Sequence, residues 1–169
     1  MRVPFSEMPP DARLWIFAAE RPLSDTEQQA LLAVVDDFLQ QWAAHGAPLA
    51  AARDLRYDRF LFVAVDESNA GASGCSIDAL TRVLAGLEKE IGLELVNHGP
   101  VLYRLGAAIV RLDRAAFAER ARRGDVAPDT IVFNNTLSRV ADLEEGRWEV
   151  PARESWHARA FFAGVAAAR

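Results

Sequence analysis

The hydrophobic run at residues 60–65 places the strongest constraint on the fold. Its six residues are Phe-Leu-Phe-Val-Ala-Val, all of them apolar. A strand with one face in solvent alternates between apolar and polar residues, whereas a strand covered on both faces does not. We therefore expect a central strand that is covered on both faces or nearly so.

The segments around this run predict a hairpin and an N-terminal strand–helix pair. Residues 50–57 form a second strand candidate, and Asp58 between the two runs favours a tight antiparallel turn. Residues 13–19 are short and rich in aromatic and branched side chains, which is typical of a strand. A helix is expected over 24–44, because Ser24 and Glu27 form a capping box and Gly46 suits its end.

The next segments predict an α+β fold with a ferredoxin-like βαββαβ core. A second amphipathic helix carries Ile77, Leu80, Leu84, Leu87 and Ile91 on one face. Short strands follow at 101–104 and 108–112, joined through Gly106. The order of elements matches the split βαβ arrangement, with a mostly antiparallel sheet. A C-terminal extension adds a helix at 113–123 and a strand at 130–134, and 169 residues suit a single domain.

The loop between the central strand and the second helix is the main candidate site. Its sequence over 66–78 is Asp-Glu-Ser-Asn-Ala-Gly-Ala-Ser-Gly-Cys-Ser-Ile-Asp. Gly71 and Gly74 permit close approach of a ligand to the backbone, while Ser73 and Ser76 leave amides accessible at a helix N-terminus, where anions bind. The helix dipole would also lower the pKa of the Cys75 thiol. Gly and Ser are ordinary loop residues too, but such a long connection favours a function.

The expected topology brings further side chains to this loop. We expect the first strand and strand 60–65 to be parallel neighbours, which would place Arg21 near Asp66 and Cys75. If strand 130–134 runs in the same direction, Asn134 and Asn135 reach that end of the sheet as well. Turn formation is the equally weighted alternative role for these two asparagines.

Charge and cysteine content limit the classes of partner. The chain has 19 Lys and Arg against 24 Asp and Glu, for a net charge of −5, which disfavours nucleic acid and anionic membranes. One cysteine and three histidines show no spacing typical of metal ligands, and no cofactor is expected. The absence of a signal-peptide run and of a long apolar segment predicts a cytoplasmic location.

Three functions follow as hypotheses. The first is binding of a small anionic ligand by Asp66, Gly71, Ser73, Gly74 and Ser76, helped by Arg21, Asn134 and Asn135. The second is a structural or protein-interaction domain. The third is a thiol enzyme with Cys75 as nucleophile, in which His157 of the C-terminal segment serves as base and an asparagine orients it.

Three motifs together resemble a small bacterial family of uncharacterised proteins. They are Asp-Glu-Ser-Asn-Ala-Gly-Ala-Ser-Gly-Cys-Ser-Ile-Asp at 66–78, Asp-Thr-Ile-Val-Phe-Asn-Asn at 129–135 and Trp-Glu-Val-Pro-Ala-Arg-Glu-Ser-Trp-His at 148–157. Members of that family often carry the label ABC transporter ATPase. This chain lacks the Gly-x-x-x-x-Gly-Lys-Ser/Thr run that cradles ATP phosphates, and its one lysine, Lys89, lies within a predicted helix. We therefore do not expect ATP hydrolysis, and the resemblance implies no other chemistry.

Overall fold

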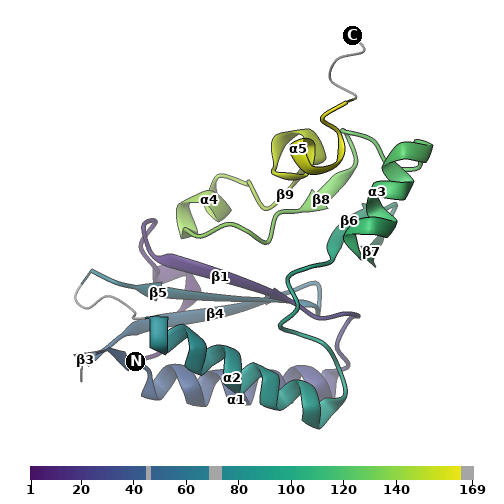
Figure 1. Cartoon of the computed structure of the whole chain (residues 1–169). Helices are drawn as coiled ribbons and strands as arrows, with labels where there is room; N and C mark the ends of the chain where they lie inside the picture. Colours follow the sequence, from purple (N-terminus) through teal and green to yellow (C-terminus); the bar gives the residue numbers. More distant parts are fainter. Residues whose placement is uncertain (45–46, 69–73, 165–169) are drawn as a thin grey trace. The chain divides into compact units, whose positions relative to one another are not determined.

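The chain is a mixed α/β protein that divides into two compact units. The computed structural model describes residues 1–44, 47–68 and 74–164. Unit 1 comprises Met1–His98 and Thr136–Glu144, and unit 2 comprises Gly99–Asn135 and Glu145–Arg169. Both units contain an antiparallel sheet and helices (Figure 1), which confirms the expected α+β class. The expectation of a single domain stays a prediction.

Unit 1 is built on a three-stranded antiparallel sheet in the order β1-β5-β4. Helices α1 and α2 lie together on one face of this sheet (Figure 1). The elements of the unit are η1 (Phe5–Glu7), β1 (Arg13–Ala18), α1 (Asp25–Gln41), β2 (Ala43–Ala44), β3 (Ala47–Pro48), β4 (Ala50–Arg56), β5 (Phe60–Asp66), α2 (Gly74–Ile91) and α4 (Val140–Glu144).

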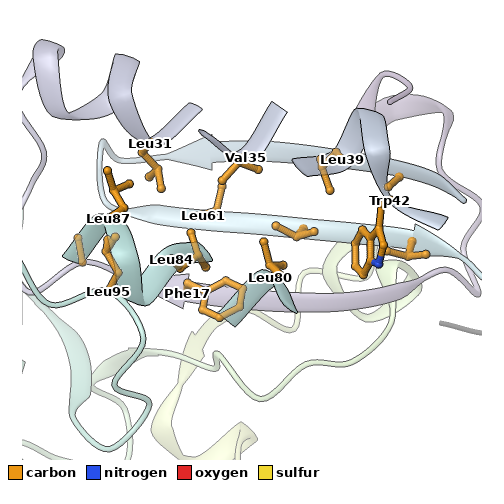
Figure 2. Packing of buried hydrophobic residues seen from close by; sticks show 14 of the residues in the cluster. Phe17, Leu31, Val35, Leu39, Trp42, Leu61, Leu80, Leu84, Leu87 and Leu95 are labelled. Atoms are coloured by element: carbon orange, nitrogen blue, oxygen red, sulfur yellow. The ribbon is translucent and has the colours of Figure 1, made fainter. Parts of the chain in front are cut away.

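Strand β5 is the central strand, as its composition predicted. Leu61, Val63 and Val65 pack into the core beneath α1 and α2. The alternating residues Phe60, Phe62 and Ala64 face the other way and are also fully buried. Burial of each large apolar side chain contributes about 2 kcal/mol. Figure 2 shows the helical side of this core, with Leu31 and Leu87 toward one end and Trp42 at the other.

Helix α1 begins as expected and ends earlier than expected. Ser24 accepts a hydrogen bond from the Glu27 amide, and the Glu27 carboxylate accepts one from the Ser24 amide, so the capping box is confirmed. The helix ends at Gln41, because Trp42 has an extended backbone with φ −68° and ψ 120°. Gly46, the expected stop, lies outside the described residues.

The direction of β1 corrects the expected topology. Arg13 pairs with Val65 and Ala18 with Phe60, so β1 and β5 are antiparallel neighbours and the expected parallel pairing is wrong. A strand–helix–strand crossover returns β4 in the direction of β1. The β4–β5 hairpin then reverses the chain, so β5 between them opposes both. The strand expected at 101–104 does not join this sheet, and the full ferredoxin-like arrangement is not confirmed.

Unit 2 contains a four-stranded antiparallel sheet in the order β7-β6-β8-β9. Its core gathers Tyr103, Phe117, Val132 and Phe162. The elements are β6 (Val101–Leu105), β7 (Ala108–Leu112), α3 (Arg114–Arg123), β8 (Ile131–Phe133), β9 (Glu149–Pro151), η2 (Ala152–Glu154) and α5 (His157–Phe161). The expected helix 113–123 is observed with Asp113 as its N-cap.

The turn between β4 and β5 holds two non-glycine residues in the left-handed region. Tyr57 and Asp58 both have φ of 52°, and the Arg59 amide closes the turn on the Arg56 carbonyl at 3.1 Å. Turns of this kind favour glycine because a side chain costs about 1 kcal/mol there. The turn predicted at Asp58 is therefore confirmed, and aspartate tolerates this backbone conformation better than most residues.

Replacing Asp58 by glycine is expected to stabilise the protein. The free energy of unfolding should rise by about 0.5–1 kcal/mol in D58G, because the left-handed backbone no longer carries a side chain. D58V should lower it by about 1 kcal/mol or more, since a β-branched residue is least compatible with positive φ. Urea denaturation followed by circular dichroism measures both. Equal shifts in the two variants would contradict a conformational origin.

Candidate functional site

The loop that the sequence singled out begins and ends on well-defined elements. Asp66 is the last residue of β5, and its carboxylate accepts a hydrogen bond from the Ser68 amide at 2.9 Å. Gly71 and Ser73 lie outside the described residues. Gly74 is the first residue of α2, and Cys75 and Ser76 follow in its first turn, although their side chains are not described.

Arg21 lies at the opposite end of the sheet from Asp66. It follows β1, whose last residue Ala18 pairs with Phe60 at the start of β5. Its guanidinium makes a bidentate ion pair with Glu27, at 2.9 and 2.8 Å. This hydrogen bond is the largest cause that lowers the pKa of Glu27 to about 2. Arg21 therefore supports the start of α1, and its expected role beside Asp66 is wrong because β1 runs antiparallel to β5.

Arg13 takes the place that was expected for Arg21. It pairs with Val65 across the sheet, next to Asp66, and its guanidinium lies 3.5 Å from the Glu67 carboxylate. The same guanidinium lies 4.9 Å from the centre of the Trp15 ring, a cation–π contact. An ion pair between Arg13 and Glu67 thus lies at the end of β5 that leads into the loop.

Trp42 adds a buried polar group at the end of the sheet where β5 finishes with Asp66. Its side chain is only 4% exposed, and its indole Nε1 has no hydrogen-bond partner within the described part of the chain. Its carbonyl accepts from the Leu49 amide at 3.1 Å, and the next residue, Ala50, pairs with Asp66. The Trp42 side chain belongs to the same hydrophobic core as Leu80, the first fully buried residue described in α2 (Figure 2).

Two buried indoles, those of Trp42 and Trp156, have an N–H without a hydrogen-bond partner among the described residues. Leaving a buried donor without an acceptor costs about 1–3 kcal/mol, and most such groups in native proteins are paired. The rings of Trp15 and Phe38 lie 6.2 and 5.1 Å from Trp42, so aromatic packing holds its orientation. Trp42, Arg13 and the first amides of α2 therefore supply donors at one end of unit 1.

The chemistry of this end suits a ligand that accepts hydrogen bonds. The N-terminus of the 18-residue helix α2 carries a partial positive charge from the helix dipole. Arg13 adds a full positive charge, while the carboxylates of Asp66 and Glu67 can accept hydrogen bonds from a ligand. Within residues 1–44, 47–68 and 74–164, no three His, Cys, Asp or Glu side chains are placed to hold a metal ion.

Asn134 and Asn135 belong to unit 2, where they anchor the C-terminal segment. The Asn134 amide donates to the Trp148 carbonyl at 2.6 Å. The Asn135 side-chain oxygen accepts from the Trp148 indole at 2.9 Å. The Trp148 ring in turn lies 5.1 Å from that of Phe133. These contacts give the two asparagines a structural role that differs from the turn formation considered above, and their role in ligand binding stays a prediction.

His157, the expected base, is a buried group of the unit 2 core. It is 1% exposed, its Nδ1 lies 2.8 Å from the Ser155 hydroxyl, and its ring stacks on Trp156 at 3.9 Å. Burial, aided by the positive charge of Arg114, lowers the pKa of His157 to about 4. The imidazole is therefore neutral at pH 7 and a weak base.

Sequence reasoning missed Arg13 and Trp42. A strand–helix–strand crossover makes β4 parallel to β1, and the tight β4–β5 hairpin makes β5 antiparallel to both. The connectivity alone would therefore have placed Arg13 beside the Asp66 end of β5. Trp42 follows the last turn of a predicted amphipathic helix, where an aromatic residue is ordinarily part of the core. Only the structure separates a packed indole from one whose N–H lacks an acceptor.

Comparisons with known proteins add no relative. Family models, curated proteins and solved structures give no significant match to the chain. The resemblance to a bacterial family stays a prediction. In the described part of the chain, none of the helices combines the length and the hydropathy that a membrane span requires.

The burial of His157 predicts an acid-sensitive contribution to stability. Its pKa is about 4 when folded and close to the ordinary value of 6.5 when unfolded. The unfolded chain therefore takes up a proton first as the pH falls. The free energy of unfolding should drop between pH 6.5 and 4 by an amount on the order of 3 kcal/mol from this group.

Urea denaturation across this pH range, compared with H157F, measures that contribution. The variant should lose the part of the pH dependence that belongs to this imidazole, whereas the contribution of the carboxylates is common to both proteins. The ring proton resonances of His157 give its pKa directly by NMR. A midpoint near 6.5 would contradict a desolvated imidazole.

Proposed function

We propose that unit 1 binds a small anionic ligand at the N-terminus of α2. The observation that carries this proposal is the buried Trp42 indole, whose N–H has no acceptor within the described residues. A bound ligand oxygen would supply the missing acceptor. The amides of Gly74 and Ser76, with Gly71 and Ser73 of the preceding loop, would bind the anionic group.

The charges around this site limit the chemical class of the ligand further. Arg13 favours an anion, whereas Asp66 and Glu67 would repel a ligand that presented only acceptors. We infer that the ligand carries a hydroxyl or amino group besides its anionic group, so that Asp66 accepts a hydrogen bond from it. Small hydroxy or amino acids and phosphorylated alcohols have this combination.

The fold supports a site at this place. We infer that β1, α1, β4, β5 and α2 form the first five elements of a ferredoxin-like core, to which unit 2 adds the C-terminal extension. Under this inference the loop after the central strand leaves the sheet at the end where Ala50 of β4 pairs with Asp66 of β5. Long loops at such positions commonly carry function.

The other two hypotheses have weaker support. Tyr57 and Leu105 are exposed apolar side chains at two hairpin turns, 48% and 59% exposed, but isolated exposed residues are ordinary. For thiol chemistry, a histidine with a pKa of about 4 would be a poor general base for Cys75 at neutral pH. Ligand binding therefore ranks before partner binding, and thiol catalysis ranks third.

A thermal-shift measurement tests the proposed site. Inorganic phosphate, sulfate, lactate and glycerol phosphate are the probes. Binding at about 100 times Kd stabilises a native protein by about 2.7 kcal/mol, which raises Tm by roughly 5–10 °C at this chain length. We expect at least one hydroxylated anion to give such a shift, and a larger one than sulfate gives.

Three variants locate the effect. W42F retains an aromatic ring but lacks the N–H, and R13Q removes the charge, so both should lose more than half of the ligand-induced shift. R21Q is the matched control, because Arg21 lies at the other end of the sheet, and its shift should equal that of the unmodified protein. No shift with any probe, or equal loss in R21Q, would contradict the proposal.

A further inference from the structure

A groove lies on the face of the unit 1 sheet that α1 and α2 do not cover. It has a volume of about 470 Å³. Its floor is β4, and its walls are η1 and α4. The lining residues are Phe5, Ser6, Asp54, Arg56, Val140, Leu143 and Glu144. Asp54 and Arg56 point to this face because they alternate along β4 with Leu55, which packs against the helical core.

The floor of the groove already holds a planar cation. The Arg56 guanidinium donates to the Asp54 carboxylate at 2.8 Å and lies 4.7 Å from the centre of the Phe62 ring. A carboxylate beside an aromatic face is the combination that recognises amidinium and guanidinium groups, through hydrogen bonds and cation–π attraction. The contacts of Arg56 thus show that this surface accommodates a planar cation.

The groove has more negative than positive charge. Asp54 and Glu144 are its acidic residues and Arg56 its basic one. Glu144 is exposed, and it makes no ion pair with any residue that the structure describes. Phe5, Val140 and Leu143 provide an apolar wall beside these charges. A ligand that complements the groove is therefore cationic at one end and apolar at the other.

We propose that this groove binds a small amphipathic cation of the amidinium or guanidinium class. The cationic group lies between Asp54 and Glu144, and the apolar part packs against Phe5 and Leu143. This site is separate from the one proposed at α2, since it lies on the opposite face of the sheet and takes the opposite charge. Its test is therefore independent of that proposal.

An NMR titration of the full chain with benzamidine tests the groove. Benzamide and benzoate have nearly the same shape but are neutral and anionic, so they separate charge from apolar contact. We expect benzamidine to shift the amide resonances of residues 5–7, 54–56 and 140–144, with a Kd at least tenfold lower than that of benzamide. Benzoate should give no shift in these segments.

The proposal predicts that some substitutions in the groove weaken benzamidine binding and that one strengthens it. D54N and E144Q should each weaken benzamidine binding about threefold to fivefold, the effect expected for one exposed charge pair. R56Q should strengthen binding, because it removes the cation that competes for Asp54 and the Phe62 ring. E90Q, on the exposed side of α2, is the matched control and should leave the Kd unchanged.

Several results would overturn the proposal. Equal affinity for benzamide and benzamidine would show that charge plays no part. Shifts confined to residues outside the groove would place the binding elsewhere. Weaker binding in R56Q would contradict the competition between Arg56 and the ligand. Dispersed spectra of each variant establish that a change in affinity does not come from unfolding.

Discussion

Burial of both faces of β5 is the constraint on which unit 1 depends. One face packs beneath α1 and α2 through Leu61, Val63 and Val65, and the other face buries Phe60 and Phe62. A strand of this kind must have a neighbour on each side, and β1 and β4 fill these places. The direction of both neighbours then decides which side chains meet at each end of the sheet.

Local signals in the sequence predicted the elements well. The capping box at Ser24 and the turn at Asp58 act over a few residues, so the neighbouring chain alone decides them. The pairing of β1 with β5 depends on residues far apart in the sequence, and the expected parallel direction was wrong. The separate sheet of the strand at 101–105 was not predicted either, because its residues were as compatible with a shared sheet as with their own.

The elements that flank the candidate site follow local patterns. Strand β5 ends one residue beyond the predicted end, and α2 lies where its apolar face predicted a helix, whereas residues 69–73 between them lie outside the described part of the chain. The arginine expected beside this loop was not predicted correctly, because its position depends on the direction of β1. Arg13, not Arg21, lies beside the Asp66 end of β5. Trp42 carries no sequence signal, since its role rests on an indole that lacks an acceptor, a property of packing alone.

The units are interleaved along the chain. Residues 136–144 belong with the first 98, and the Leu14 amide donates to the Ser138 carbonyl while the Val140 amide donates to that of Ala12. A ribosome must therefore synthesise the strands and helix at 101–133 before unit 1 receives its last segment. Truncation after His98 would expose the edge of β1, so the native form of unit 1 requires nearly the whole polypeptide.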